Sequence, residues 1–160
     1  MSYQIVAVSE EISRKVRKEM RSPQYGHPAF VEVAKGYGPC RSCLRKFDEG
    51  REERILFTYN PFEGLSDLPL PGPVFIHGAD CERYEKEGFP EELLDLPLLF
   101  EGFGETGRLE TRVGIDRSAV DDQIRAVLDT PGVDYIYVRN AEAGCFVARI
   151  DPLNELCDAL

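Results

Sequence analysis

Two short motifs place cysteine and histidine in pairs that are spaced for holding one metal ion. Cys40 and Cys43 form a C-x2-C pair in a tight Gly/Pro setting. His77 and Cys81 form an H-x3-C pair after 33 intervening residues. Two pairs of this kind, each closing a small loop, are how a tetrahedral zinc site is usually assembled. The four side chains therefore predict a zinc site whose ion mainly holds this part of the chain together.

The C-x2-C pair is open to other interpretations. A structural zinc site has four protein ligands, whereas a catalytic site keeps one position open for water. In a thiol-dependent redox protein, Cys40 and Cys43 would instead cycle through a disulfide. A thioredoxin-like protein is disfavoured, because Asp48-Glu49-Gly50 would break the long helix that should follow the motif. Both cysteines could also be unligated thiols, with His77 a hydrogen-bonded histidine at a strand end.

A third group of reactive side chains lies nearer the C-terminus. Arg139 and Asn140 close one predicted strand, and Cys145 opens the next. Arginine can clamp a carboxylate or phosphate, asparagine can orient it, and cysteine beside a base can act as a nucleophile. These residues predict an anion site, which the thiol-dependent alternative would use together with Cys40. The competing interpretation is a tight hairpin in which Asn140 and Gly144 supply the turn and Cys145 packs inward.

Composition limits the class of protein. The 160 residues are 42% hydrophobic and 30% charged, which predicts one globular domain spanning 1–160. The net charge of -10 argues against nucleic-acid binding, which depends on neutralising phosphates. No run is long enough to cross a bilayer, and the N-terminal apolar run has no basic leader, so we expect a cytoplasmic protein. Its five cysteines, Cys157 included, should then be reduced. No P-loop, G-x-G-x-x-G or G-x-S-x-G motif supports nucleotide or serine-hydrolase chemistry.

Periodicity predicts the elements that position these motifs. Residues 3–8 alternate as a strand, and Ser9 is a suitable N-cap for a helix in which Ile12, Val16 and Met20 share one face. Runs rich in β-branched and aromatic residues then predict strands at 29–34, 54–59 and 73–77, the last of which delivers His77.

The second half of the chain predicts more strands and one clear helix. A proline-rich surface loop is expected at 63–73, one or two helical turns at 81–87, and another short helical segment at 90–96. The helix near 118–130 begins with Ser118 and Asp121, which resemble a capping box. Four further strands are predicted at 97–103, 108–113, 135–139 and 145–150, the last two forming a C-terminal β-hairpin. Together these elements predict an α+β domain with a mainly antiparallel sheet.

Residues 38–86 resemble a treble-clef zinc finger, including the finger of poly(ADP-ribose) polymerases. The order of elements is similar: a cysteine knuckle, a hairpin and a helix start, here expected at Cys81, where a helix N-terminus favours thiolate. Three residues separate His77 from Cys81, where those fingers commonly have two. The resemblance does not extend to DNA-break binding, because the basic surface that this needs is missing.

Three separated motifs resemble the bacterial domain-of-unknown-function family 1203. They are Gly-Pro-Cys-Arg-Ser-Cys-Leu-Arg at 38–45, Gly-Pro-Val-Phe-Ile-His at 72–77 followed by Cys81-Glu82-Arg83-Tyr84, and Val-Asp-Tyr-Ile-Tyr-Val-Arg-Asn-Ala-Glu-Ala-Gly-Cys-Phe at 133–146. The resemblance implies a small single-domain bacterial protein with no established activity. It also brings the three cysteine-bearing segments into one pattern, which favours a shared site that includes Arg139, Asn140 and Cys145.

Overall fold

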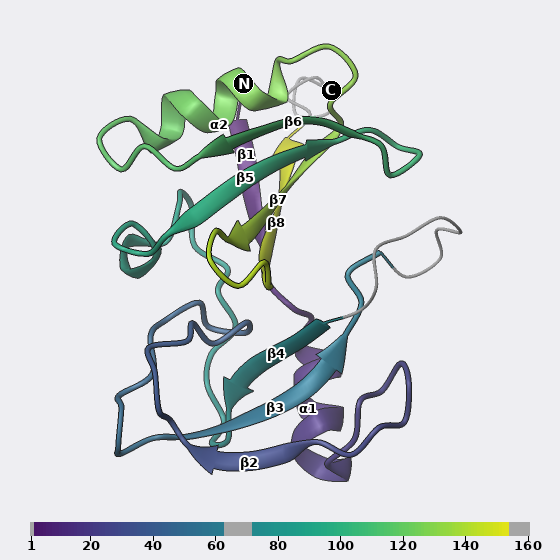
Figure 1. The fold of residues 1–160 in the computed structure, drawn as a ribbon, viewed down its shortest axis with the longest axis vertical. Helices are drawn as coiled ribbons and strands as arrows, with labels where there is room; N and C mark the ends of the chain where they lie inside the picture. Colours follow the sequence, from purple (N-terminus) through teal and green to yellow (C-terminus); the bar gives the residue numbers. More distant parts are fainter. Residues whose placement is uncertain (1, 63–71, 154–160) are drawn as a thin grey trace, which may run out of the picture.

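The computed structural model describes residues 2–62 and 72–153, and within them it has two helices and eight strands. The strands form a five-stranded sheet and a three-stranded sheet, both antiparallel, and each sheet lies beside one helix (Figure 1). The α+β prediction is therefore confirmed, although the sequence did not predict the division into two sheets. Most of the loop expected at 63–73 lies outside the described residues. Cys157 lies outside them as well.

The larger sheet is built mainly from the C-terminal half of the chain. In spatial order its strands are β1 (Ser2–Val6), β8 (Phe146–Leu153), β7 (Tyr135–Asn140), β5 (Leu98–Phe103) and β6 (Leu109–Gly114). The pairing of β7 with β8 confirms the predicted C-terminal hairpin. Helix α2 (Val120–Leu128) covers this sheet (Figure 1), and its Ile124 is buried in the same cluster as Phe100 and Ile136.

The smaller sheet carries the segments that lead into and out of the two Cys/His motifs. Its strands, in order, are β2 (Phe30–Val33), β3 (Glu53–Tyr59) and β4 (Gly72–His77). Helix α1 (Glu10–Glu19) begins where predicted, because Ser9 Oγ accepts a hydrogen bond from the backbone N–H of Ile12 at 3.2 Å. Val16 is fully buried in one cluster with Ile55 and Ile76, so the apolar face of α1 packs on this sheet.

The predicted helical turn at 81–87 is wrong, because long-range hydrogen bonds hold this segment in an irregular conformation. The Tyr84 N–H donates to the carbonyl of Ser42 at 2.9 Å, and the Arg83 guanidinium donates to the carbonyl of Ala7 at 2.8 Å. Nothing in residues 81–87 alone reveals these partners. The turn expected at 90–96 is present as one short 3₁₀ turn, η1 (Glu91–Leu93).

The start of the second helix also differs from the prediction. Helix α2 begins at Val120 with Ala119 in the cap position, and no side chain caps it. The amide and hydroxyl of Ser118 donate instead to Asp116 Oδ1, at 3.0 Å and 2.6 Å. Ser118 therefore closes a turn before the helix. A serine side chain can bond to a nearby acceptor instead of capping a helix, and here that acceptor is Asp116.

Two hydrophobic clusters meet at the C-x2-C segment. One fills the space between α2 and the larger sheet, and the other lies between α1 and the smaller sheet and includes Cys40 and Cys43. Leu44, the next residue, is fully buried in the first cluster. Residues 40–44 therefore belong to both cores and connect the two sheets.

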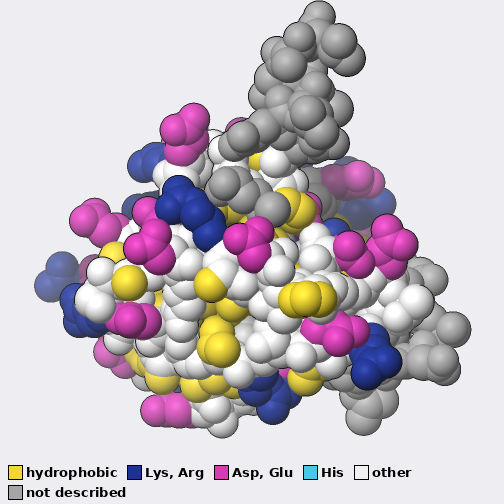
Figure 2. All heavy atoms as spheres, turned by 90° about the horizontal axis from the view of Figure 1, so that it is seen from above, with side chains coloured by type: hydrophobic (Ala, Val, Ile, Leu, Met, Phe, Trp, Pro, Cys, Tyr) yellow, Lys and Arg dark blue, Asp and Glu magenta, His cyan; other side chains and the backbone are white. Residues whose placement is uncertain are grey.

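The surface seen in Figure 2, at the α2 end of the molecule, carries acidic, basic and hydrophobic side chains interspersed with one another. Over residues 2–62 and 72–153, neither helix has the length and hydrophobicity that crossing a bilayer requires.

Candidate metal centre

The C-x2-C segment folds into a tight knuckle because backbone hydrogen bonds form within residues 40–45. The Cys40 N–H donates to the carbonyl of Arg45, and the Leu44 N–H donates to the carbonyl of Cys40, both at 2.9 Å. Leu44 adopts φ +60°, a left-handed conformation that turns the chain back on itself. Gly38, with φ +92°, precedes the knuckle, and any Cβ there would lie 2.4 Å from the Phe47 ring. This backbone presents both thiols to the same point.

Strand β4 and the short loop after it supply the other two donors. His77 is the last residue of β4, which pairs with β3 so that His77 lies opposite Arg54. The Gly78 N–H donates to the carbonyl of Glu53 at 2.9 Å, which turns the chain towards Cys81. The order of knuckle and β3–β4 hairpin matches the treble-clef expectation, but the helix expected at Cys81 is absent.

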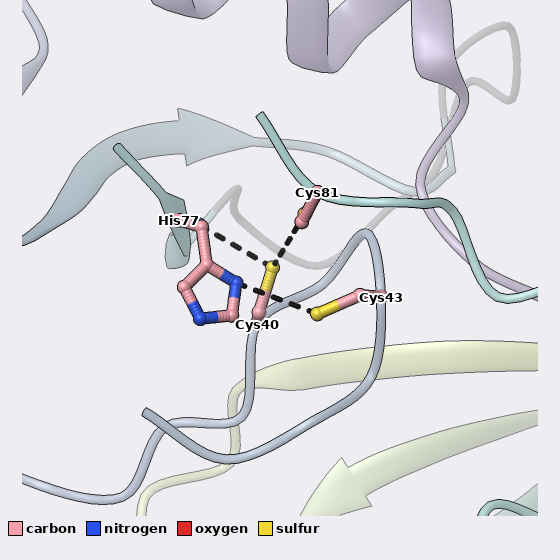
Figure 3. A group of neighbouring side chains, drawn as sticks. All are labelled: Cys40, Cys43, His77 and Cys81. Atoms are coloured by element: carbon pink, nitrogen blue, oxygen red, sulfur yellow. Dashed lines mark hydrogen bonds between the residues drawn. The ribbon is translucent and has the colours of Figure 1, made fainter. Parts of the chain in front are cut away.

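The four predicted donors converge on one point. The ligand atoms of Cys40, Cys43, His77 and Cys81 all lie within 4.8 Å of one another (Figure 3). The two sulfurs of Cys40 and Cys81 are 3.8 Å apart, and Cys43 Sγ is 3.4 Å from His77 Nδ1. Tetrahedral Zn–S bonds of about 2.3 Å and Zn–N bonds of about 2.0 Å need edges of about 3.8 Å and about 3.6 Å. The residues thus lie close enough to bind a metal ion.

The orientation of His77 suits a metal ligand. Its Nδ1 faces Cys43, while its Nε2 lies 2.9 Å from Glu52 Oε2. The second carboxylate oxygen, Glu52 Oε1, accepts the N–H of Asp48 at 2.8 Å, so the carboxylate itself is held in place. The Phe47 ring packs against the imidazole in an edge-to-face arrangement, with 4.7 Å between the ring centroids. A histidine ligand usually donates its other ring N–H to such a carboxylate, which sets the tautomer.

Hydrogen bonds and burial within the cluster shift the pKa values of its side chains in opposite directions. Hydrogen bonds from Cys40 and Cys43 hold the pKa of Cys81 far below its usual range. Burial raises the pKa of Cys40 well above its usual value. A hydrogen bond with Cys43 raises the pKa of His77 to about 9. A divalent ion entering the cluster must therefore displace protons, as in other thiolate sites.

The knuckle is also a junction between distant parts of the chain. Arg41, at 4% exposure, donates its backbone N–H to the carbonyl of Phe75 at 3.0 Å and its Nε to the carbonyl of Phe146 at 2.7 Å. Its own carbonyl accepts the N–H of Val8 at 3.0 Å. One residue between the two thiols thus bonds to β4, to β8 and to the chain between β1 and α1.

One surface cavity reaches the cluster at Cys43. A cavity of about 960 Å³ is lined by Cys43, Leu44 and Arg45 and, opposite them, by side chains from 82–87 and 89–92. Cys40 and His77 do not line it. Of the four donors, Cys43 alone lines this cavity, whereas the partly exposed Cys81 lies outside it.

The structure gives Arg139, Asn140 and Cys145 places outside the four-donor group. Arg139 Nε pairs with the buried carboxylate of Glu101. Asn140 Oδ1 accepts the N–H groups of Glu142 and Ala143, at 2.9 Å and 2.8 Å, as in a tight turn. Cys145 is partly exposed, with its Sγ 4.0 Å from the carbonyl of Ala143. A ligand-binding role for these three residues stays a prediction.

Sequence reasoning did not assign Glu52 or Arg17 to the site, although both contact donors. Glu52 precedes β3, and the register of the predicted hairpin would have brought it near His77. Arg17 Nη2 donates to Cys81 Sγ at 3.3 Å, from a helix 64 residues earlier in the chain. Only the packing of α1 on the smaller sheet brings that guanidinium to the cluster.

Comparisons with known proteins identify the family and nothing narrower. No curated protein and no solved structure matches the sequence. The model of one family matches residues 37–151, a span that contains the knuckle, His77, Cys81 and the β7–β8 hairpin. The chain therefore belongs to the DUF1203 family, whose members are described as proteins of unknown function.

Proposed function

We propose that this protein binds one zinc ion through Cys40, Cys43, His77 and Cys81, and that the ion is structural. The supporting observation is the geometry of the donors: the Cys40–Cys81 sulfur separation of 3.8 Å and the Cys43 Sγ–His77 Nδ1 separation of 3.4 Å are close to the edges of a zinc tetrahedron. Three thiolates and one imidazole are a donor set that structural zinc sites use. Because all four positions are filled by protein, no position is left open for a catalytic water.

The position of the cluster favours a role in stability. Cys40 and Cys43 belong to the core of the smaller sheet, while Leu44 belongs to the core of the larger one. An ion that joins the knuckle to the end of β4 would fasten the segment through which the two cores meet. Binding energy for a site that the unfolded chain lacks adds to folding stability.

We also propose that the protein resides in a reducing compartment such as the cytoplasm, where its cysteines stay reduced. The cysteines of the described residues, Cys40, Cys43, Cys81 and Cys145, form no disulfide. Zinc thiolates persist where thiols are kept reduced.

Metal analysis of protein purified without chelator tests the proposal. We expect about one zinc per chain, and a lower midpoint of thermal unfolding after the ion is removed with a chelator. Cys43→Ser should lose the zinc, because it replaces one of the donors. Cys145→Ser is the matched control and should retain it, since Cys145 lies outside the four-donor group.

A different result would favour the thiol-dependent alternative. Metal-free wild-type protein in which two of the clustered cysteines titrate as a reversible disulfide would contradict the zinc proposal. Mass spectrometry after differential alkylation would identify that pair. Cys40 and Cys81, with sulfurs 3.8 Å apart, would be the first candidates.

A further inference from the structure

Arg17 is a positive charge in direct contact with the donor cluster. Its Nη2 donates to Cys81 Sγ at 3.3 Å, and its Nε donates to the carbonyl of His77 at 3.1 Å. Its Nη1 also lies 3.8 Å from Asp80, but that carboxylate is fully exposed, so the ion pair contributes little. The Arg17 side chain is only 12% exposed. Its two contacts to the His77–Cys81 loop are therefore largely shielded from water.

The net charge expected for the zinc-bound site favours a positively charged side chain beside the sulfurs. A divalent ion with three thiolates and a neutral imidazole carries one net negative charge, which resides on the sulfurs. Cys81 is only partly buried, whereas Cys40 and Cys43 are buried. A thiolate at the edge of a site is the one most open to electrophiles, and hydrogen bonds to a thiolate lower its reactivity. Arg17 supplies both a hydrogen bond and the neutralising charge at that sulfur.

The helix that carries Arg17 is fixed independently of the metal centre. Val16, the preceding residue, is fully buried against the smaller sheet, and Ser9 caps the first turn. Arg14, one turn earlier, is 73% exposed and pairs with Glu10 at 2.8 Å. The two arginines of one helix thus have different surroundings, since only Arg17 contacts the His77–Cys81 loop.

We infer that Arg17 is a positioning residue of the metal centre, which holds the His77–Cys81 loop and neutralises the Cys81 thiolate. It thereby strengthens metal binding and protects that sulfur from electrophiles. The inference rests on the proposed zinc site and extends it to helix α1, which supplies none of the four donors. Outer residues that contact metal ligands typically change metal affinity by about 10- to 100-fold.

The test compares Arg17→Met, which keeps the apolar stem, with Arg17→Lys, which keeps the charge but loses the planar fork. Zinc affinity is measured by competition with a chromophoric chelator. The rate of zinc release is measured during alkylation with iodoacetamide, and mass spectrometry identifies the modified cysteine. We expect Arg17→Met to bind zinc about 10- to 100-fold more weakly and to be alkylated faster at Cys81. Arg17→Lys should fall between it and the wild type, and the control Arg14→Met should match the wild type.

The outcomes separate this inference from the proposed function. A wild-type chain that binds no zinc overturns both. A wild-type chain that binds zinc, with a folded Arg17→Met variant of equal affinity and equal alkylation rate, overturns the role of Arg17 alone. If circular dichroism shows Arg17→Met to be unfolded, Arg17→Lys decides: weaker binding supports the inference, and binding equal to the wild type overturns it.

Discussion

His77 and Glu52 face each other at the end of the β3–β4 hairpin, with Nε2 of the imidazole 2.9 Å from Oε2 of the carboxylate. This contact leaves Nδ1 turned towards Cys43, 3.4 Å from its sulfur. When an ion displaces the Nδ1 proton, this carboxylate would hold the remaining proton on Nε2, so that the Nδ1 lone pair faces the ion. A residue that is not a donor itself thus prepares a donor for the ion.

Replacing Glu52 tests this relationship. Glu52→Gln keeps the size of the side chain but removes the charge that orients and polarises His77. We expect zinc affinity, measured by chelator competition, to fall by about 10- to 100-fold. Glu53→Gln is the matched control, because Glu53 is the exposed neighbouring residue, and it should bind zinc like the wild type. Equal affinities for the two variants would contradict the orienting role of Glu52.

Gly38 should be essential to the knuckle for two reasons that can be separated. Its φ of +92° disfavours any side chain, and a Cβ would also lie 2.4 Å from the Phe47 ring. Gly50 shares only the first property, with φ +77° and no atom within 4 Å of a Cβ. Gly50→Ala should therefore cost about 1–2 kcal/mol of unfolding free energy for its backbone. Gly38→Ala should add an overpacking cost of about 1–3 kcal/mol.

Urea unfolding of both glycine variants provides the measurement. The difference between them reports the steric cost at Phe47. If both variants lose the same stability, the close approach of Gly38 to Phe47 is not important in solution.

The two serines predicted to begin helices should respond differently to alanine. Ser9 accepts the Ile12 N–H at the start of α1, so Ser9→Ala should destabilise the protein by about 1 kcal/mol. Ser118 is exposed, and its amide and hydroxyl donate to Asp116 ahead of α2, so Ser118→Ala should cost less. Urea midpoints compare the two, and a larger loss for Ser118→Ala would mean that Ser118 caps α2 after all.

We expect the free energy of unfolding to fall at alkaline pH because of the buried Tyr137 phenol. Burial raises its pKa to about 12 from the ordinary 10, and its hydroxyl donates to the carbonyl of Pro61 at 2.9 Å. Because the folded-state pKa is the higher one, the buried phenol contributes fully below pH 10, and that contribution is lost as the pH rises towards 12. Because the hydroxyl is only partly buried, solvent screening reduces the corresponding free energy to about 1–2 kcal/mol.

Tyr137→Phe removes the ionisable group and tests this dependence. Between pH 9 and 12, wild-type unfolding free energy should fall more steeply than that of Tyr137→Phe. At pH 8 the variant should be less stable by about 1 kcal/mol, since it lacks the hydrogen bond to Pro61. Parallel pH profiles for the two proteins would rule out Tyr137 as the source of the alkaline loss.

Arg139 illustrates how a plausible site residue acquires a structural partner through folding. In the sequence it stands beside Asn140 as a candidate anion clamp. In the fold its guanidinium pairs with Glu101 of the neighbouring strand β5, and Glu101 is also bonded by Arg112 at 2.6 Å. Glu101 is 38 residues away from Arg139 in the sequence, so no local sequence pattern predicts this ion pair.

Local sequence patterns predicted the strands, the two helices and the donor pairs, because each depends on residues a few positions apart. Alternation defines a strand face, the spacing of Ile12, Val16 and Met20 defines a helix face, and C-x2-C closes a loop within a single turn. These features depend on residues that are close in sequence, so they can be recognised without knowing the tertiary structure.

Long-range packing governs the rest. It divided the strands between two sheets, held 81–87 out of a helix, and brought Arg17 to the donors. Contacts of this kind join residues that are distant in sequence, and their geometry arises from the combined burial of many side chains. A hydrogen bond between Arg17 and Cys81 exists because Val16 is buried against the sheet, and that dependence is a property of the folded chain alone.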